Sequence, residues 1–198
     1  MLGCAVALIL LMDVSASIGD ADWQKQRDGT ADALAHPTVQ GIVEALEGGV
    51  AIQAMVFGGR AHVALPWRVA RSGADLDAFA TDMKALQRRT EMSTNTGRAM
   101  DTAVDQMAQT PCTPAKKVID LSTDGIDDKV PVEAARNKAQ AKGIIVNAIG
   151  VGSYPDLETF LRDSTITEDG FAIISEGWDD FARAILRKIR MEIAAKAD

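Results

Sequence analysis

Short apolar runs alternate with longer amphipathic stretches along most of the chain. The apolar runs predict strands at residues 5–12, 50–57, 61–67, 117–121, 144–149 and 171–175. Helical periodicity predicts helices at residues 20–35, 74–86, 97–107, 132–142, 155–162 and 178–195. Gly58 and Gly59 separate the second strand from the third at a spacing that indicates a hairpin. The pattern predicts a three-layer, doubly wound α/β fold: a mostly parallel six-stranded sheet with one antiparallel edge strand and helices on both faces.

Helix ends and one helix face carry further signals. His36 and Pro37 stop the first predicted helix, and Gly143 suits the left-handed cap after the fourth. In the last predicted helix, Phe181, Ile185 and Ile189 fall on one stripe, which is typical of a helix that docks on a sheet.

The composition is typical of a globular domain with an acidic surface. At 198 residues the chain is long enough for one well-buried core, so we expect a single domain spanning residues 1–198. The hydrophobic fraction of 47% and the charged fraction of 25% are close to the average for globular proteins. There are 28 Asp and Glu against 21 Lys and Arg, and the net charge of −7 disfavours nucleic acid or an anionic bilayer as a partner.

Residues 1–12 resemble the core of a signal peptide, and Ser15-Ala16-Ser17 resembles a cleavage site. However, no Lys or Arg precedes the apolar run, and cleavage there would remove Asp13. The run is also shorter than the roughly 20 apolar residues that span a bilayer. We therefore expect a buried first strand and no membrane insertion by this segment; if the protein is exported, its natural signal is expected to be absent from this sequence.

Oxygen-bearing side chains gather where strands end. Asp13, Ser15 and Ser17 directly follow the first strand, and side chains two residues apart in an extended segment point the same way. Thr94 lies in a polar link before a helix, and Asp124 terminates the fourth strand. In open α/β sheets, ligands bind at the carboxyl ends of strands. Because the set contains oxygens and neither His nor Cys, it favours a hard cation such as Mg²⁺, Mn²⁺ or Ca²⁺.

Each of these signals has a local structural alternative when it is taken alone. Ser and Asp are favoured helix caps, so Asp13, Ser15 and Ser17 are also a reasonable cap. The segment Thr123-Asp124-Gly125 has the composition of a simple turn. The three segments together, in this order along the chain, favour the site over the caps and turns.

The segments DVSAS, STNTG and LSTDG, in this order and at these intervals, resemble the three loops of the metal-ion-dependent adhesion site (MIDAS) of von Willebrand factor type A domains. The resemblance covers essentially the whole chain. Four further segments, WQKQRDG, LPW, KKVIDLSTDG and GWDDFARAILRKI, are similar to a proteobacterial branch of uncharacterised proteins of this type. Ser93 stands where relatives usually have glycine, which leaves the exact path of that loop open but keeps its oxygen ligand.

The resemblance implies five metal ligands: Asp13, Ser15, Ser17, Thr94 and Asp124. The choice of Thr94 over Thr96 follows the family pattern. Mg²⁺ is the expected ion, with Mn²⁺ and Ca²⁺ as alternatives. Hydroxyls offset little of the charge of a divalent ion, so the bound ion stays electrophilic and accepts an outside carboxylate. The implied function is noncatalytic, metal-dependent binding or adhesion to a protein partner that presents an Asp or Glu.

Two other functional classes compete with this interpretation. One is a structural or assembly subunit of a larger complex that makes no use of a metal. The other is a metal-assisted hydrolase, for which the sequence offers no evident base. The 2 histidines are His36, expected at the far end of the first helix, and His62, in the hairpin, and we expect neither to reach the carboxyl ends of the strands. We therefore expect no catalysis.

Asp127 and Asp128 lie just beyond the last predicted ligand. They add negative charge at the rim of the site and are candidates for binding a second cation. A solvated acidic turn is the commoner role of such a pair.

The chain has 2 cysteines, Cys4 and Cys112, and neither belongs to a CxxC pair. Cys4 lies near the start of the first predicted strand, and Cys112 lies shortly before the fourth. If these two strands are neighbours in the sheet, the two cysteines lie close together at its amino-terminal edge. The sequence leaves two states open, a disulfide and two reduced thiols. A disulfide would imply an oxidising compartment such as the periplasm or the exterior.

Overall fold

One six-stranded sheet organises the computed structural model, which describes residues 2–89 and 91–194. The strands are β1 (Gly3–Asp13), β2 (Val50–Phe57), β3 (Ala61–Ala70), β4 (Thr113–Thr123), β5 (Ile144–Val151) and β6 (Ala172–Ser175). They lie in the order β3-β2-β1-β4-β5-β6, and neighbours are parallel except β2 and β3, which form the antiparallel hairpin. The predicted fold class and its antiparallel edge strand are confirmed.

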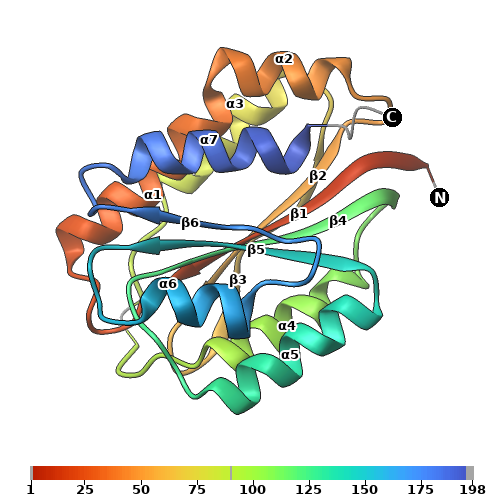
Figure 1. Cartoon of the computed structure of the whole chain (residues 1–198). Coiled ribbons are helices and arrows are strands. Elements are labelled where there is room, and N and C mark those ends of the chain that lie inside the picture. Colours follow the sequence, from red (N-terminus) through yellow and green to blue (C-terminus); the bar gives the residue numbers. More distant parts are fainter. Residues whose placement is uncertain (1, 90, 195–198) are drawn as a thin grey trace.

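Helices cover both faces of this sheet (Figure 1). One face carries α1 (Asp20–Ala35), α2 (Pro37–Ala45), α3 (Gly73–Lys84) and α7 (Phe181–Ile193). The other carries α4 (Thr96–Met107), α5 (Lys129–Ala141) and α6 (Leu157–Phe160), which continues into a π-helical segment, Leu161–Thr165. Each face has its own hydrophobic core. Among the described residues, no helix combines the length and the apolar character needed to cross a membrane.

The central strand β1 is buried on both faces, which explains its unbroken apolar run. Leu8 and Leu10 pack into the core beneath α1 and α7. Ala7, Ile9 and Leu11 pack into the core beneath α4 and α5. Because both faces are covered, the strand shows no alternation of apolar and polar residues.

The clearest departure from the predicted elements is α2, which the sequence pattern did not indicate. Pro37 ends α1 as predicted, but it also occupies the first turn of α2. Backbone N–H groups in the first turn of a helix have no hydrogen-bond partner within the helix, so proline is tolerated there. The side chain of His36 accepts a hydrogen bond from the backbone N–H of Thr38 and caps the new helix. Only Val39 and Val43 of α2 are buried, so its apolar pattern is weak.

A disulfide joins the amino-terminal ends of two neighbouring strands. Cys4 lies in β1 and Cys112 immediately precedes β4, and their Cα atoms are 5.8 Å apart. The two residues are separated by 108 positions in the sequence. Of the two states that the sequence left open, the structure has the bridged one.

The terminal helix α7 has the predicted apolar stripe, because Phe181, Ile185 and Ile189 are all buried against the sheet. The helix begins at Phe181, later than predicted, and the predicted end at residue 195 lies outside the described residues. Lys188 and Glu192 are also fully buried, which the stripe does not predict.

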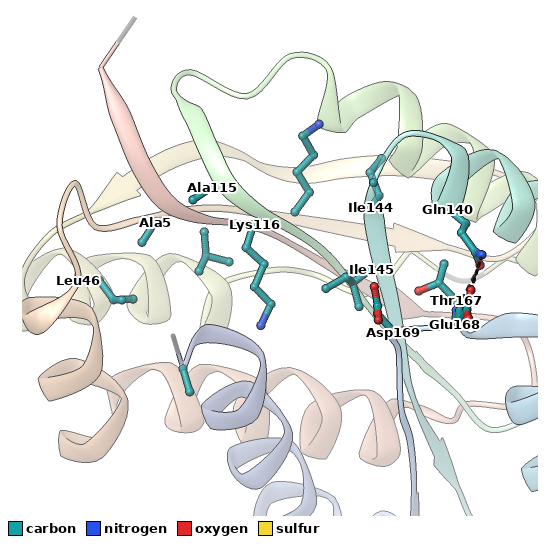
Figure 2. Close-up of a pocket in the computed structure, with 14 residues that line it drawn as sticks. Ala5, Leu46, Ala115, Lys116, Gln140, Ile144, Ile145, Thr167, Glu168 and Asp169 are labelled. Atoms are coloured by element: carbon teal, nitrogen blue, oxygen red, sulfur yellow. Dashed lines mark hydrogen bonds between the residues drawn. The ribbon is translucent and has the colours of Figure 1, made fainter. Parts of the chain in front are cut away.

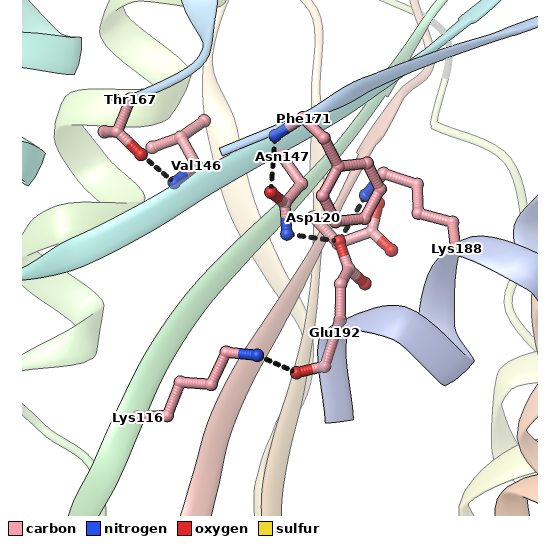
Figure 3. Close-up of polar contacts among 8 residues, drawn as sticks. All are labelled: Lys116, Asp120, Val146, Asn147, Thr167, Phe171, Lys188 and Glu192. Carbon is pink, nitrogen blue, oxygen red and sulfur yellow. Dashed lines mark hydrogen bonds and ion pairs between the residues drawn. The ribbon is translucent and has the colours of Figure 1, made fainter. Parts of the chain in front are cut away.

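A group of buried charges ties α7 to the sheet (Figure 3). The ammonium of Lys188 lies 2.5 Å from a carboxylate oxygen of Asp120 in β4 and 2.6 Å from one of Glu192. Asn147 in β5 donates a 3.0 Å hydrogen bond to the same Glu192 oxygen, and Lys116 donates one of 2.7 Å to the backbone carbonyl of Glu192. Burial, together with the charge of Asp120, raises the pKa of Glu192 well above its usual value.

Removal of the disulfide tests its contribution to stability. Replacing Cys4 and Cys112 together with Ala releases a loop of 108 residues in the unfolded chain. We expect the free energy of unfolding to fall by about 2–5 kcal/mol. Urea unfolding of the oxidised wild type and of the double variant measures the difference, and a reductant should destabilise only the wild type. Equal stability of the two proteins contradicts the expectation.

Replacing Glu192 with Gln tests the protonation of the buried charge group. Because folding raises the pKa of this carboxyl group, its contribution to stability is fully present below the ordinary pKa of 4.5 and is lost as the pH rises through the folded-state pKa. We expect the wild type to lose free energy of unfolding relative to Glu192→Gln as the pH rises. Urea denaturation of both proteins at a series of pH values measures this. A difference that stays constant with pH contradicts the assignment.

Candidate metal centre

The candidate residues meet at the carboxyl edge of the sheet. Met12 of β1 pairs with Ser122 of β4, so the next residues, Asp13 and Thr123, end neighbouring strands at the same level. Residues 14–19, which contain Ser15 and Ser17 and which we call the serine loop, follow β1, and Asp124 follows β4. In Figure 1 the loops after these strands lie together on the left side of the view.

Hydrogen bonds connect four of the five predicted ligands. One carboxylate oxygen of Asp13 accepts from the backbone N–H of Ser15 at 2.7 Å, and the other accepts from the Thr123 hydroxyl at 2.7 Å. The hydroxyl oxygens of Ser15 and Ser17 are 3.1 Å apart. Ser17 donates to a carboxylate oxygen of Asp124 at 2.8 Å. Asp13, Ser15, Ser17 and Asp124 therefore form one connected set of oxygens.

Both carboxylates of this set are in surroundings that disfavour their charge. Burial raises the pKa of Asp13 to about 6, although hydrogen bonds from Ser15 and Thr123 act in the opposite direction. Burial also raises the pKa of Asp124, and the hydrogen bond from Ser17 partly offsets that rise. A divalent cation at these oxygens would favour the charged form of both groups.

The donor set fits a hard divalent ion. It consists of carboxylate and hydroxyl oxygens, which are the ligands that Mg²⁺, Mn²⁺ and Ca²⁺ prefer. Among the described residues, no group of three or more His, Cys, Asp or Glu is placed to hold a metal.

Thr94 reaches the same edge on a third loop, but it stands apart from the connected set. It is half-buried, and no hydrogen bond among the described residues joins its side chain to the other four predicted ligands. Thr96, two residues later, is completely buried at the start of α4, and its hydroxyl has no hydrogen-bond partner among the described residues. We call residues 85–89 and 91–96, between α3 and the first residue of α4, the threonine loop. Of its two threonines after Ser93, Thr94 is half-buried and Thr96 is fully buried.

This threonine loop is laid against the ends of β1 and β2. The backbone N–H of Glu91 donates to the carbonyl of Val14, and that of Asn95 donates to the carbonyl of Gly58. A Cβ atom at Gly58 would collide with the side chain of Glu91, and one at Gly59 would lie 2.9 Å from the hydroxyl of Ser93. The two glycines allow the loop to pass close to the hairpin.

Arg88 links the threonine loop to the serine loop, a contact that no sequence pattern predicts. Its guanidinium donates to the backbone carbonyls of Ile18 and Ser15 and forms an ion pair of 2.6 Å with Asp20. Arg88 therefore adds side-chain contacts to the backbone contacts between Glu91 and the serine loop.

Gln26 is a second residue at this edge that sequence reasoning missed. It is completely buried on α1. Its amide nitrogen donates to the backbone carbonyl of Asp13 at 2.8 Å, and its amide oxygen accepts from the Ser122 hydroxyl at 2.6 Å. The available signal was its position three residues after Trp23, which puts a polar amide on the buried face of the helix.

The predicted rim residues Asp127 and Asp128 make local hydrogen bonds. Asp127 accepts from the backbone N–H groups of Thr96 and Asp128, each at 2.8 Å. Asp128 accepts from the backbone N–H of Val130 and caps α5. These contacts hold the beginnings of α4 and α5, and binding of a second cation stays a prediction.

One histidine lies nearer to this edge than expected. His36 is at the far end of α1, as predicted. His62 pairs with Val56, close to the end of β2, because the antiparallel β3 starts at the edge where β2 stops. The imidazole Nε2 of His62 lies 3.4 Å from the carboxylate of Glu91. The expectation that neither histidine reaches the carboxyl ends of the strands is therefore wrong for His62, although its partner is a glutamate rather than a serine.

A cavity of about 680 Å³ lies at the opposite edge of the sheet (Figure 2). Its walls come from the amino-terminal ends of β1, β4 and β5 and from Ala194 after α7. Leu46 and Ile145 supply apolar surface, while Lys116 and Asp169 carry opposite charges. This cavity contains none of the predicted ligands.

The family model described as "Protein of unknown function (DUF1194)" matches residues 3–197. The chain belongs to this family. A search of curated proteins returned no match.

Solved structures show that this DUF1194 protein has the von Willebrand factor type A fold. A von Willebrand factor type A protein from Catenulispora acidiphila is 17% identical, with a TM-score of 0.72 over 96% of this chain and 43% of that one. Proximal thread matrix protein 1 from the mussel byssus is 18% identical, with a TM-score of 0.73 over 96% of this chain and 46% of that one. Another structure of the mussel protein is described as having a zinc-occupied MIDAS motif.

A shorter relative aligns along nearly its whole length. BatB from Bacteroides thetaiotaomicron is 18% identical, with a TM-score of 0.62 over 95% of this chain and 98% of that one. By contrast, the chain spans less than half of the mussel and Catenulispora chains. At these identities the similarity establishes the fold.

Replacing Thr123 with Val tests the hydrogen bond that supports Asp13. The change removes the hydroxyl that donates to the Asp13 carboxylate at 2.7 Å while keeping the shape of the side chain. We expect the pKa of Asp13, about 6 in the wild type, to rise further in metal-free protein. Nuclear magnetic resonance titration of the carboxyl carbon measures it. Thr110→Val, which removes a hydroxyl bound to Met107, is the control. An unchanged pKa in Thr123→Val contradicts the expectation.

Proposed function

We propose that this protein binds other proteins through a divalent cation at the carboxyl edge of its sheet, without catalysing a reaction. One observation carries the proposal: Ser15 and Ser17 from one loop and Asp124 from another form a connected set of oxygens beside the buried carboxylate of Asp13. The fold supports it, because the mussel protein with this fold is described with a zinc-occupied MIDAS motif.

Each group in the set has a distinct role in this proposal. The hydroxyls of Ser15, Ser17 and Thr94 would bind the ion and leave most of its charge uncompensated. Asp13 and Asp124 would supply the negative charge that retains it. A cation held in this way attracts a carboxylate from outside, so the expected partner is a protein that presents an Asp or Glu.

Mg²⁺ is the ion that we propose, with Mn²⁺ and Ca²⁺ as alternatives. All the donors are oxygens, and hydroxyl and carboxylate oxygens are typical Mg²⁺ ligands. Zinc prefers nitrogen and sulfur ligands, but the zinc-occupied motif described for the mussel protein makes Zn²⁺ a necessary comparison in any titration.

A structural or assembly subunit without a metal is the second candidate. The observation that favours it is the hydrogen bonding within the site, because the Ser17 hydroxyl already donates a 2.8 Å hydrogen bond to the Asp124 carboxylate. A set of polar groups that is paired internally does not need a cation to remain folded. Cation titration separates the two candidates.

An oxidising compartment, the periplasm or the exterior, is part of the proposal. The disulfide between Cys4 and Cys112 supports it, because such bonds persist where thiols are not kept reduced. The net charge of −7 supports protein partners over nucleic acid.

Replacing Asp13 with Asn should strongly weaken cation binding. The amide oxygen can still accept from Ser15, so the fold is expected to persist while the charge that retains the ion is lost. We expect the affinity for Mg²⁺ to fall by more than about tenfold, or 1.4 kcal/mol. Isothermal titration calorimetry with Mg²⁺, Mn²⁺, Ca²⁺ and Zn²⁺ measures this. A wild type that gives the same heats as Asp13→Asn favours the assembly subunit.

Two matched controls accompany this titration. Asp128→Asn removes a carboxylate of the same edge that caps α5, and it should leave cation binding at the Asp13 site unchanged. Thr94→Val should weaken binding, whereas Thr96→Val, at the buried hydroxyl, should not. The reverse result for the two threonines would reassign the ligand while leaving the cation site in place.

A further inference from the structure

Exposed large hydrophobic side chains are concentrated at the edge that carries the candidate metal centre. Among the described residues, such side chains belong to Leu2, Val63, Met92, Ile126, Val130, Tyr154, Ile174 and Met191. Half of these, Met92, Ile126, Val130 and Tyr154, are on segments of the carboxyl edge. We call these four residues the apolar rim. Single exposed hydrophobic residues are ordinary, but a group around one site indicates an interaction surface.

Met92 lies on one side of the serine loop. It follows Glu91, which forms an isolated parallel β-bridge with Ser15. Its neighbour Ser93 is packed against the hairpin glycines. The side chain of Met92 is 87% exposed, although both flanking residues are anchored. The apolar group is therefore presented to solvent beside the predicted hydroxyl ligands.

Ile126 and Tyr154 lie on the other side. Ile126 is two residues beyond Asp124. Thr123 of β4 pairs with Gly150 of β5, and Tyr154 is in the loop that follows β5. Because neighbouring strands are about 4.8 Å apart, that loop leaves the sheet only about 10 Å from β1. Apolar groups thus flank the candidate ligands on both sides. Tyr154 is the single tyrosine of the sequence.

Val130 extends the rim over the start of α5, where the helix meets α4. It is 73% exposed. A Cβ atom at Gly97 of α4 would lie 2.7 Å from the backbone carbon of Pro131, so the two helix starts are in close contact here. The rim residue is therefore supported by a rigid base.

The loops on the Tyr154 side also carry strong negative charge. The loops at residues 124–128, 152–156 and 176–180 contain seven acidic residues and no Lys or Arg: Asp124, Asp127, Asp128, Asp156, Glu176, Asp179 and Asp180. Asp179 and Asp180 form ion pairs with Lys25 and Arg183, whereas the other five form no ion pair among the described residues. A partner segment that carries several carboxylates is repelled here unless each carboxylate meets a cation. A basic residue beside a single carboxylate is favoured instead.

We infer that the apolar rim is the docking surface for a partner segment in which one Asp or Glu lies between large apolar side chains and is followed by a basic residue. This inference rests on the proposed function, because the cation engages the carboxylate. The rim residues bury the apolar side chains of the partner, and burial of such side chains at the centre of an interface provides much of its affinity. The acidic loops set the position of the basic residue.

Synthetic peptides provide the probe. The first has a central aspartate between leucine and phenylalanine, followed by glycine and arginine. Three comparison peptides replace the aspartate with asparagine, both apolar residues with alanine, or the arginine with glutamate. Fluorescence anisotropy with labelled peptides, in Mg²⁺ and in EDTA, measures each affinity. We expect the first peptide to bind only in Mg²⁺ and about tenfold more tightly than the alanine or the glutamate peptide.

Rim variants identify the surface responsible. Met92→Ser combined with Tyr154→Ser should remove the preference for the leucine-phenylalanine peptide over the alanine peptide. Both side chains are more than half exposed, so the fold and the Mg²⁺ affinity measured by calorimetry should be unchanged. Met191→Ser on α7, an exposed methionine outside the carboxyl edge, is the matched control and should keep the preference.

The outcomes separate the inference from the proposed function. Metal-dependent binding of all the aspartate peptides with equal affinity, or a preference that survives in the rim variant, overturns the docking surface and leaves the cation-mediated function standing. The absence of Mg²⁺-dependent binding for every aspartate peptide counts against the function itself and against the inference with it. A preference for the glutamate peptide over the arginine peptide overturns the role assigned to the acidic loops.

Discussion

The parallel pairing of β1 with β4 is the constraint on which the candidate site depends. This register ends both strands at one level, so that Asp13 and Thr123 are neighbours although they are 110 residues apart. The serine loop then leaves β1 beside Asp124, and Ser17 can donate to its carboxylate. A shift of one residue in this pairing would turn every side chain of β1 to the opposite face and separate these groups.

The stabilising interactions of the sheet are distributed unevenly between its two edges. The disulfide joins β1 and β4 at the amino-terminal edge, and the buried Lys188 connects α7 to Asp120 in the interior of β4. The carboxyl edge is instead built from loops held by polar side chains such as Gln26 and Arg88. This arrangement leaves the candidate ligands on a rigid base, with Asp13 and Ser15 buried and Ser17 exposed at the surface of the edge.

The periodic features of the fold could be predicted from the sequence, whereas the features that depend on tertiary partners could not. The apolar run of β1 and the stripe of α7 follow from burial, and both are confirmed. The helix α2 was missed because only Val39 and Val43 of it are buried. Gln26 and Lys188 look like ordinary polar positions on helices until Asp13 and Asp120 are placed opposite them. The prediction for His62 was wrong because the antiparallel β3 begins at the edge where β2 ends, which brings His62 beside Val56.

The central claim is that oxygens from three separate loops surround one divalent cation. Anomalous diffraction from crystals grown with Mn²⁺ tests it most directly, because the anomalous signal of the metal distinguishes it from water and lighter ions. The account predicts one strong peak at the carboxyl edge, within coordination distance of the hydroxyls of Ser15 and Ser17 and close to Asp13 and Asp124. Crystals with abundant Mn²⁺ that show no peak there, with Ser17 still bonded to Asp124, would contradict it.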